Sequence, residues 1–229
     1  MAGRLYGIGV GPGDPELMTL KAVRLIEQCD IVAVPKSGEG EGVAKQIARG
    51  AVKNFDQKQI VEIAMPMTRD PQLLEQSHQQ AAQTIEAFLD EDKTVVFLTL
   101  GDPAIYSTYI YIHKRVMAHG YPVEMVPGVP SFCAVAAKLN TGLAEGAQPL
   151  HIIPASYKGV EEGLEWSGPK VLMKTGRSMK KVKDLLRQKD LLDKAMMVQK
   201  CGMEGEEIFH SMREVDENAS YFSVIVVEE

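Results

Sequence analysis

Apolar runs alternate with helical patterns along the first half of the chain. Buried strands are predicted for five such runs, at residues 5–10, 30–34, 61–65, 94–100 and 122–126. Helices are predicted for residues 17–28 and 106–119, and for the segment before residue 94, where Leu74, Ala81 and Ile85 lie near one helix face. Strands that alternate with helices in this way predict a parallel sheet covered by helices.

The second half of the chain has a different pattern. Further strands are predicted at residues 151–154, 170–174, 195–200, 207–211 and 221–227, with one strong helix at 179–186. The connections between the last three strands are too short for a long helix, so antiparallel pairing is expected there. The sequence therefore predicts an α/β protein of two α/β domains, at residues 1–127 and 128–229. The first holds a parallel sheet with flanking helices, and the second a mixed, largely antiparallel sheet.

Composition and charge narrow the class of protein. The chain has 229 residues, 45% of them hydrophobic, and a formal net charge of −6, which disfavours a nucleic-acid partner. The sequence has neither an apolar run of about 20 residues, the length that spans a bilayer, nor a signal-peptide pattern, so we expect a cytoplasmic protein with no membrane partner. Cys29, Cys133 and Cys201 are far apart, and the histidines are dispersed. We therefore expect free thiols and no protein-bound metal.

A glycine-rich segment, residues 7–15, follows the first predicted strand. A dinucleotide-binding turn would need a further glycine where Pro12 or Asp14 stands. It would also need an acidic residue near the end of the second strand, where the chain has Val34-Pro35-Lys36. Asp14 as N-cap and Pro15 as the first helical residue fit an ordinary strand-to-helix turn. The closely spaced glycines instead fit a backbone that approaches a ligand closely.

Two further loops follow predicted strands. Gly101 and Asp102 come after the fourth strand, at the carboxyl end where open parallel sheets bind ligands. The alternative is that Asp102 simply caps the next helix. Residues 126–132 follow the fifth strand, and their prolines and glycine fit either a ligand loop or a domain linker. Cys133, in the apolar helix after this loop, is expected in the core rather than as a nucleophile.

Four motifs occur in one order along the chain. They are Gly9-Val10-Gly11-Pro12-Gly13-Asp14, Gly101-Asp102-Pro103, Pro127-Gly128 and Leu172-Met173. In order and spacing this set resembles the tetrapyrrole methylase family, the class III methyltransferases, over essentially the whole chain. Residues 65–70, 97–103, 106–108 and 127–132 look most similar to one branch, the precorrin-2 or cobalt-factor II C-20 methyltransferases.

The resemblance implies a homodimer that binds the methyl donor S-adenosylmethionine, and its product S-adenosylhomocysteine, in a cleft between the two domains. The family's donor site carries over by position onto Pro12, Leu100, Gly101, Asp102, Ile105, Pro130, Ser131, Met173 and Cys201. Relatives often have Thr or Ser where Pro130 stands, and Gly or Ala where Cys201 stands. Pro130 has no N–H, so a donor contact there must come from its carbonyl or its ring.

The resemblance also implies methylation at C-20 of precorrin-2 or cobalt-factor II, in cobalamin biosynthesis. Because such a tetrapyrrole carries many carboxylates, we expect basic side chains at its rim. The candidates are Lys36, Arg69 and Lys45, with Tyr106 as a further substrate contact; alternatively the three bases are merely solvated. The donor sulfonium is already a strong electrophile, so the protein needs to align the reactants and exclude water, and no catalytic residue is predicted.

Other functions remain open from the sequence. The fold could methylate a different corrin carbon, or an RNA or protein acceptor, although the negative charge disfavours RNA. A carrier that holds the same ligands without reacting them is a further alternative. The metal state of the acceptor also stays open, because the metal would arrive inside the substrate.

Overall fold

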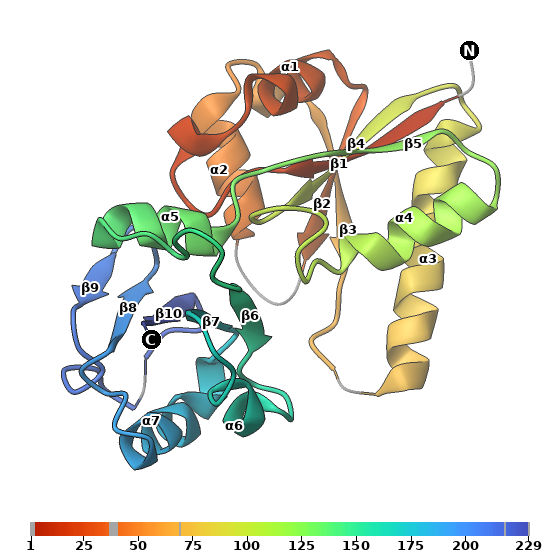
Figure 1. Ribbon diagram of the computed structural model, residues 1–229. Helices are drawn as coiled ribbons and strands as arrows, with labels where there is room; N and C mark the ends of the chain where they lie inside the picture. The colour runs from red at the N-terminus through yellow and green to blue at the C-terminus, as the bar shows by residue number, and fades with distance from the viewer. Residues whose placement is uncertain (1–2, 37–40, 69, 218, 229) are drawn as a thin grey trace. The chain divides into compact units, whose positions relative to one another are not determined.

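The computed structural model describes residues 3–36, 41–68, 70–217 and 219–228 (Figure 1). Contacts within the chain divide it into two compact units, Met1–Pro130 and Ser131–Glu229. The domain boundary expected after residue 127 stays a prediction. Each unit has its own sheet, and each is described by itself below.

The first unit holds a five-stranded sheet in the order β3-β2-β4-β1-β5. Its strands are β1 (Arg4–Gly9), β2 (Ile31–Lys36), β3 (Gln59–Ala64), β4 (Thr94–Thr99) and β5 (Val123–Val126). Every pairing in this sheet is parallel, as the sequence predicted. The strand order places β4, β1 and β5 next to one another, so the loops that follow these strands leave the same edge of the sheet.

Helices cover both faces of this sheet (Figure 1). They are α1 (Leu20–Gln28), α2 (Val43–Ala51), α3 (Pro71–Leu89) and α4 (Tyr109–Ala118), with a 3-10 turn at Phe55–Gln57. Ile8 and Leu98 belong to a buried cluster with α1 and α2, whereas Leu5 and Phe97 belong to a second cluster with α3 and α4. Side chains on a strand point alternately to opposite faces, so one apolar strand contributes to both cores.

Two helices of the first unit begin later than the sequence predicted. A 3-10 turn at Pro15–Leu17 precedes α1, with the Asp14 carboxylate accepting a hydrogen bond from the Glu16 N–H, so the predicted cap at Asp14 is confirmed. The helix itself begins later, at Leu20. Helix α4 begins at Tyr109 rather than at 106, because Tyr106 has a φ of +50°, which a right-handed helix cannot contain. Helix α2 was not predicted.

The second unit holds a sheet in the order β6-β7-β10-β8-β9. Its strands are β6 (His151–Pro154), β7 (Lys170–Met173), β8 (Ala195–Gln199), β9 (Glu207–Phe209) and β10 (Ser223–Val227). Only the pairing of β6 with β7 is parallel among the described strand pairs of this sheet, and the others are antiparallel. The predicted mixed, largely antiparallel sheet is therefore confirmed.

The second sheet is also covered on both faces. Helices α6 (Val160–Gly163) and α7 (Met179–Gln188) contribute to the buried cluster on one face, and a 3-10 turn at Gly176–Ser178 precedes α7. Helix α5 (Ser131–Leu139) packs against β8 and β10 on the other face (Figure 1). Cys133 on α5 is exposed, so its expected place in the core is wrong. Within the described residues, no helix is both long and apolar enough to cross a membrane.

Candidate functional site

The loops after β1 and β4 are joined directly at the carboxyl edge of the first sheet. The Gly11 N–H donates to the Gly101 carbonyl at 3.2 Å, and the Gly101 N–H donates back to the Gly11 carbonyl at 2.8 Å. Both glycines have positive φ angles, +81° and +71°, which other residues rarely adopt. This isolated antiparallel bridge lies just beyond the last parallel β1–β4 pair, Gly9 with Thr99, and fixes the two loops together.

The loop after β5 joins the same cluster through a close backbone approach. A Cβ on Gly9 would lie 2.6 Å from both the Gly101 carbonyl oxygen and the Gly128 nitrogen. A Cβ on Gly128 would collide with the Gly101 carbonyl oxygen as well. Gly9 and Gly128 are therefore required by the contact among the three loops, which explains two of the glycines in the predicted ligand motifs.

The Asp102 carboxylate connects two of these loops. Its Oδ1 accepts a hydrogen bond from the Ala104 N–H at 2.8 Å, and its Oδ2 accepts one from the Gly128 N–H at 3.0 Å. The first bond closes a turn within the loop; Asp102 does not cap helix α4, whose N-cap is Thr108, so the helix-cap alternative is wrong. The second bond reaches a residue 26 positions away. Asp102 therefore orders the backbone of the candidate site.

The space beside Gly101 is open. A Cβ built on Gly101 would have the Val129 carbonyl oxygen as its nearest neighbour, at 4.0 Å. Leu100 and Ile105 are half-buried, whereas Pro12 and Gly101 are buried. These four predicted donor residues lie on the two loops that the Gly11–Gly101 bridge joins. Glycine backbone with room in front of it fits a ligand that lies against the main chain.

A buried tyrosine packs beneath these loops. A Cβ on Gly7 would enter the Tyr109 ring, and the Tyr109 hydroxyl lies 3.1 Å from His113 Nδ1. Burial raises the pKa of Tyr109 and lowers the pKa of His113, so both groups are neutral at pH 7. Sequence reasoning missed Tyr109; the glycine opposite it, Gly7, was the available signal.

The remaining predicted donor residues lie at the boundary between the two units and at strand ends in the second unit. Pro130 ends the first unit, and Ser131 begins α5. Met173 ends β7, and Cys201 follows β8. Both strands run antiparallel to β10, so their carboxyl ends lie on the same edge of the second sheet. Burial, together with the nearby Glu206 carboxylate, raises the pKa of the Cys201 thiol, which is therefore protonated at neutral pH.

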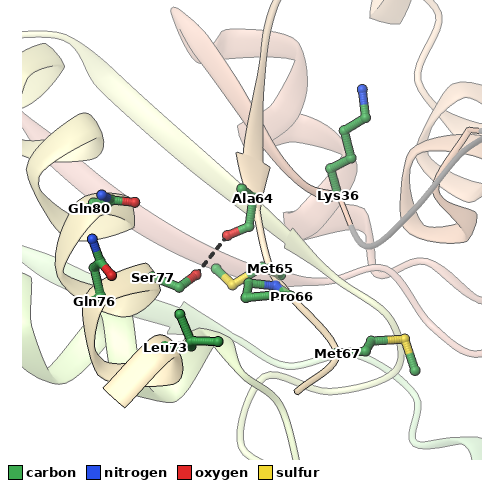
Figure 2. A pocket seen from close by; sticks show the side chains of 9 residues that line it. All are labelled: Lys36, Ala64, Met65, Pro66, Met67, Leu73, Gln76, Ser77 and Gln80. Carbon is green, nitrogen blue, oxygen red and sulfur yellow. Dashed lines mark hydrogen bonds between the residues drawn. The ribbon is translucent and has the colours of Figure 1, made fainter. Parts of the chain in front are cut away.

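A pocket of about 580 Å³ lies at the ends of β2 and β3 (Figure 2). It is lined by Lys36, Ala64, Met65, Pro66, Met67, Leu73, Gln76, Ser77 and Gln80. Figure 2 shows the α3 side chains along one wall, where the Ser77 hydroxyl donates to the Ala64 carbonyl at 3.0 Å. Sequence reasoning named Lys36 but missed Gln76 and Gln80, whose spacing of four residues on a helix was the available signal.

The other predicted substrate residues differ in their surroundings. Lys36 pairs with Glu62 at 2.5 Å, and Lys45 pairs with Glu41 at 3.2 Å. Tyr106 is 46% exposed and has a φ of +50°. Arg69 lies outside the described residues. Among the residues that the structure describes, no group of three or more His, Cys, Asp or Glu is placed to hold a metal ion.

The sequence of the chain matches one family of known proteins. Residues 4–216 match the family of Tetrapyrrole (Corrin/Porphyrin) Methylases. The match covers most of the chain, so the chain belongs to this family.

Curated relatives match over nearly full length. A probable cobalt-precorrin-2 C(20)-methyltransferase of Methanocaldococcus jannaschii is 33% identical, over 98% of this chain and 96% of the relative. The cobalt-precorrin-2 C(20)-methyltransferase of Salmonella typhimurium is 33% identical, over 99% of this chain and 97% of the relative. A precorrin-2 C(20)-methyltransferase of Sinorhizobium is 29% identical, over 98% of this chain and 95% of the relative.

Solved structures share the fold. A cobalt precorrin-4 methyltransferase superposes with a TM-score of 0.77 at 20% identity, over 98% of this chain and 94% of that one. A uroporphyrin-III C-methyltransferase of Thermus thermophilus, in complex with S-adenosyl homocysteine, superposes with a TM-score of 0.72 at 22% identity, over 99% and 92%. The predicted architecture of two α/β parts is thus that of known methylases.

Proposed function

We propose that the chain is an S-adenosylmethionine-dependent C-methyltransferase that methylates C-20 of precorrin-2 or cobalt-factor II in cobalamin biosynthesis. The observation that carries the proposal is the convergence of three glycine loops at one sheet edge, in a chain 33% identical to a cobalt-precorrin-2 C(20)-methyltransferase over 98% of its length. The Thermus thermophilus relative was solved with S-adenosyl homocysteine, which supports the donor.

The proposed donor residues are those of the family's site: Pro12, Leu100, Gly101, Asp102, Ile105, Pro130, Ser131, Met173 and Cys201. The open space beside Gly101 supports this assignment, because a donor lying there would touch backbone without meeting a side chain. The Val129 carbonyl oxygen borders that space, and Asp102 directly follows Gly101 in the chain. The partial negative charge of the carbonyl oxygen and the charge of the carboxylate favour a ligand that carries a positive sulfonium.

The pocket at the ends of β2 and β3 supports a place for the acceptor. Methionine, proline and leucine side chains suit the flat face of a macrocycle, and the two glutamine amides and the Lys36 ammonium suit its carboxylates. The pocket shares the carboxyl edge of the sheet with the donor loops, because β2 lies next to β4. On substrate binding, Lys36 would exchange its ion pair with Glu62 for one with a substrate carboxylate. Both side chains are 48% exposed, so breaking the Lys36–Glu62 pair requires little free energy.

The chemistry requires little from side chains. When bound, the donor supplies an electrophilic methyl group for an in-line displacement by the acceptor carbon. The chain's part is to hold the loops after β1, β4 and β5 in one rigid arrangement, and to fix the macrocycle so that C-20 faces the donor. A displacement of about 1 Å can cost a hundredfold in rate, so regiospecificity follows from positioning.

One experiment tests the donor, the reaction and the position of the methyl group together. The purified chain is incubated with S-adenosylmethionine labelled with carbon-13 in its methyl group, and with precorrin-2 or cobalt-factor II. Mass spectrometry reads the gain of one methyl group, and carbon-13 NMR reads its position. A label at another carbon contradicts the C-20 assignment alone. Donor binding without turnover favours a carrier, and absence of S-adenosylhomocysteine binding at millimolar concentration refutes the donor site.

The resemblance also leads us to propose a cytoplasmic homodimer. A stable dimer buries roughly 2,000 Å² or more between its subunits. Light scattering at micromolar concentration should therefore report twice the chain mass of 25.2 kDa. A monomer under these conditions would contradict the proposal without affecting the reaction assigned to the chain.

A further inference from the structure

The loop after β8, residues 200–206, has a constrained backbone. Lys200 and Gly202, on either side of Cys201, have φ angles of +51° and +72°. A left-handed conformation at a residue other than glycine is unfavourable and persists where the surrounding structure holds it. The position of Cys201, a proposed donor contact, therefore depends on what holds residues 200–206.

Glu206 closes this loop. Its Oε2 accepts a hydrogen bond from the Gly202 N–H at 2.6 Å, and its Oε1 pairs with Lys138 Nζ at 2.9 Å. Hydrogen bonds to a charged carboxylate are among the stronger ones in proteins. The Gly202 N–H and then the Lys138 ammonium lower the pKa of Glu206, so the carboxylate is charged at neutral pH.

The same carboxylate links the loop to α5. Lys138 lies in the last turn of α5, whose first residue is Ser131, a second proposed donor contact. Helix α5 packs against β8, the strand that leads into the loop. Glu206 therefore ties together two segments of the second unit that both carry proposed donor contacts, through one backbone bond and one ion pair.

We propose that Glu206 is a positioning residue for the methyl donor: it holds the Cys201–Gly202 turn against α5 without touching the donor itself. This inference rests on the proposed function. It predicts that removing the Glu206 carboxylate loosens the turn, so the affinity for the methyl donor falls. The proposed contacts of the tetrapyrrole substrate, which lie in the first unit, are unaffected.

The test compares Glu206→Ala, Glu206→Gln and Lys138→Met with the wild-type chain. S-adenosylhomocysteine affinity is measured by calorimetry, and the KM values for donor and acceptor are measured separately. Glu206→Ala should bind S-adenosylhomocysteine about tenfold more weakly, as expected for one lost charge-assisted hydrogen bond, with an unchanged acceptor KM. Glu206→Gln keeps an oxygen for the Gly202 N–H and should recover most of the affinity. Lys138→Met should have a smaller effect, since an exposed ion pair contributes little.

Glu204→Gln is the matched control, because it neutralises an exposed carboxylate in the same loop. It should behave like the wild type. If wild type binds S-adenosylhomocysteine and the folded Glu206→Ala variant binds it equally well, this inference is wrong and the proposed function stands. An equal loss of donor and acceptor affinity, with no rescue by Gln, would also overturn it by showing a general structural defect. If the wild type itself does not bind, the proposed function fails first. Should Glu206→Ala not fold, Glu206→Leu, which likewise lacks an acceptor for the Gly202 N–H, takes its place with the same expected loss of donor affinity.

Discussion

The carboxylate of Asp102 accepts a hydrogen bond from the backbone N–H of Gly128 at 3.0 Å. The loop after β4 thereby holds the loop after β5, across the β1 strand that lies between them in the sheet. The other carboxylate oxygen accepts from Ala104 within its own loop. A single side chain thus fixes the backbone on both sides of Gly9.

The first prediction concerns this tie. Asp102→Ala should lower the free energy of unfolding by about 1–3 kcal/mol, because two backbone N–H groups lose their acceptor. It should also weaken S-adenosylhomocysteine binding, since the Gly128 loop is released. Urea denaturation and equilibrium dialysis measure the two effects. Asp70→Ala is the control, because Asp70 caps α3 through Gln72 and Leu73. It should lose similar stability and keep donor affinity; equal donor affinity in both variants would contradict a role for the Asp102 tie.

The second prediction concerns the contact at Gly9. Gly9→Ala should destabilise the chain by about 3 kcal/mol or more, because the added Cβ meets backbone atoms of Gly101 and Gly128 that cannot move independently. Thermal and urea denaturation report this loss. Gly142→Ala is the matched control, since its Cβ would meet no described atom within 4 Å. Similar stabilities of the two variants would show that the loops separate easily.

The third prediction separates strain from binding at Tyr106. Tyr106→Gly removes the strain of a left-handed non-glycine residue, which stabilises the folded state by about 1–2 kcal/mol. It also raises the entropy of the unfolded chain, which destabilises the fold by about 0.5–1 kcal/mol. Stability should therefore change little or rise, while the acceptor KM rises because an exposed ring is lost. Asp92→Gly, at an exposed residue with a φ of +61°, is the control and should leave the KM unchanged. An unchanged acceptor KM in Tyr106→Gly would remove this residue from the substrate site.

The fourth prediction concerns charge at the pocket. Lys36→Gln should raise the acceptor KM severalfold and leave S-adenosylhomocysteine affinity intact, with a change in stability of no more than about 1 kcal/mol. Steady-state kinetics with each substrate varied in turn measures the split. Lys21→Gln removes a lysine of the same side-chain exposure, 48%, paired with Glu124 away from the pocket, and should have wild-type kinetics. If both variants behave alike, Lys36 is a solvated surface residue.

The fifth prediction concerns alkaline pH. Burial, against the opposing effect of Lys58, raises the pKa of the Cys29 thiol from near 9 to about 11. The fold favours the neutral thiol, so its contribution to stability is full below pH 9 and is lost as the pH rises through 11, by about 3 kcal/mol at most. Denaturation between pH 8 and 11 should show a shallower decline for Cys29→Ala than for the wild type. Cys133→Ala, at an exposed thiol, should keep most of the wild-type slope; identical slopes for Cys29→Ala and the wild type would refute the assignment.

The strands were the most predictable part of the fold. Each predicted apolar run overlaps a strand. A strand buried on both faces needs consecutive apolar residues, such as those of Val95–Leu98. The errors are the late starts of two helices, the unpredicted helix α2 and the exposure of Cys133. Nothing in the local pattern reveals that Tyr106 adopts a left-handed conformation, which delays α4, or that Cys133 on an apolar helix faces outward.

The sequence by itself determined the two sheets, their different pairing and the loops that carry the family's motifs, because periodicity and glycine spacing are local properties of the chain. Tertiary structure decided which contacts and hydrogen bonds those loops make with one another. Gly9, Gly101 and Gly128 come together only when β1 lies between β4 and β5. Tertiary structure also decided that Asp102 accepts a hydrogen bond from the Gly128 N–H and that Glu206 accepts one from the Gly202 N–H. A hydrogen bond between segments far apart in sequence depends on their folded positions, and residue type and spacing alone do not encode it.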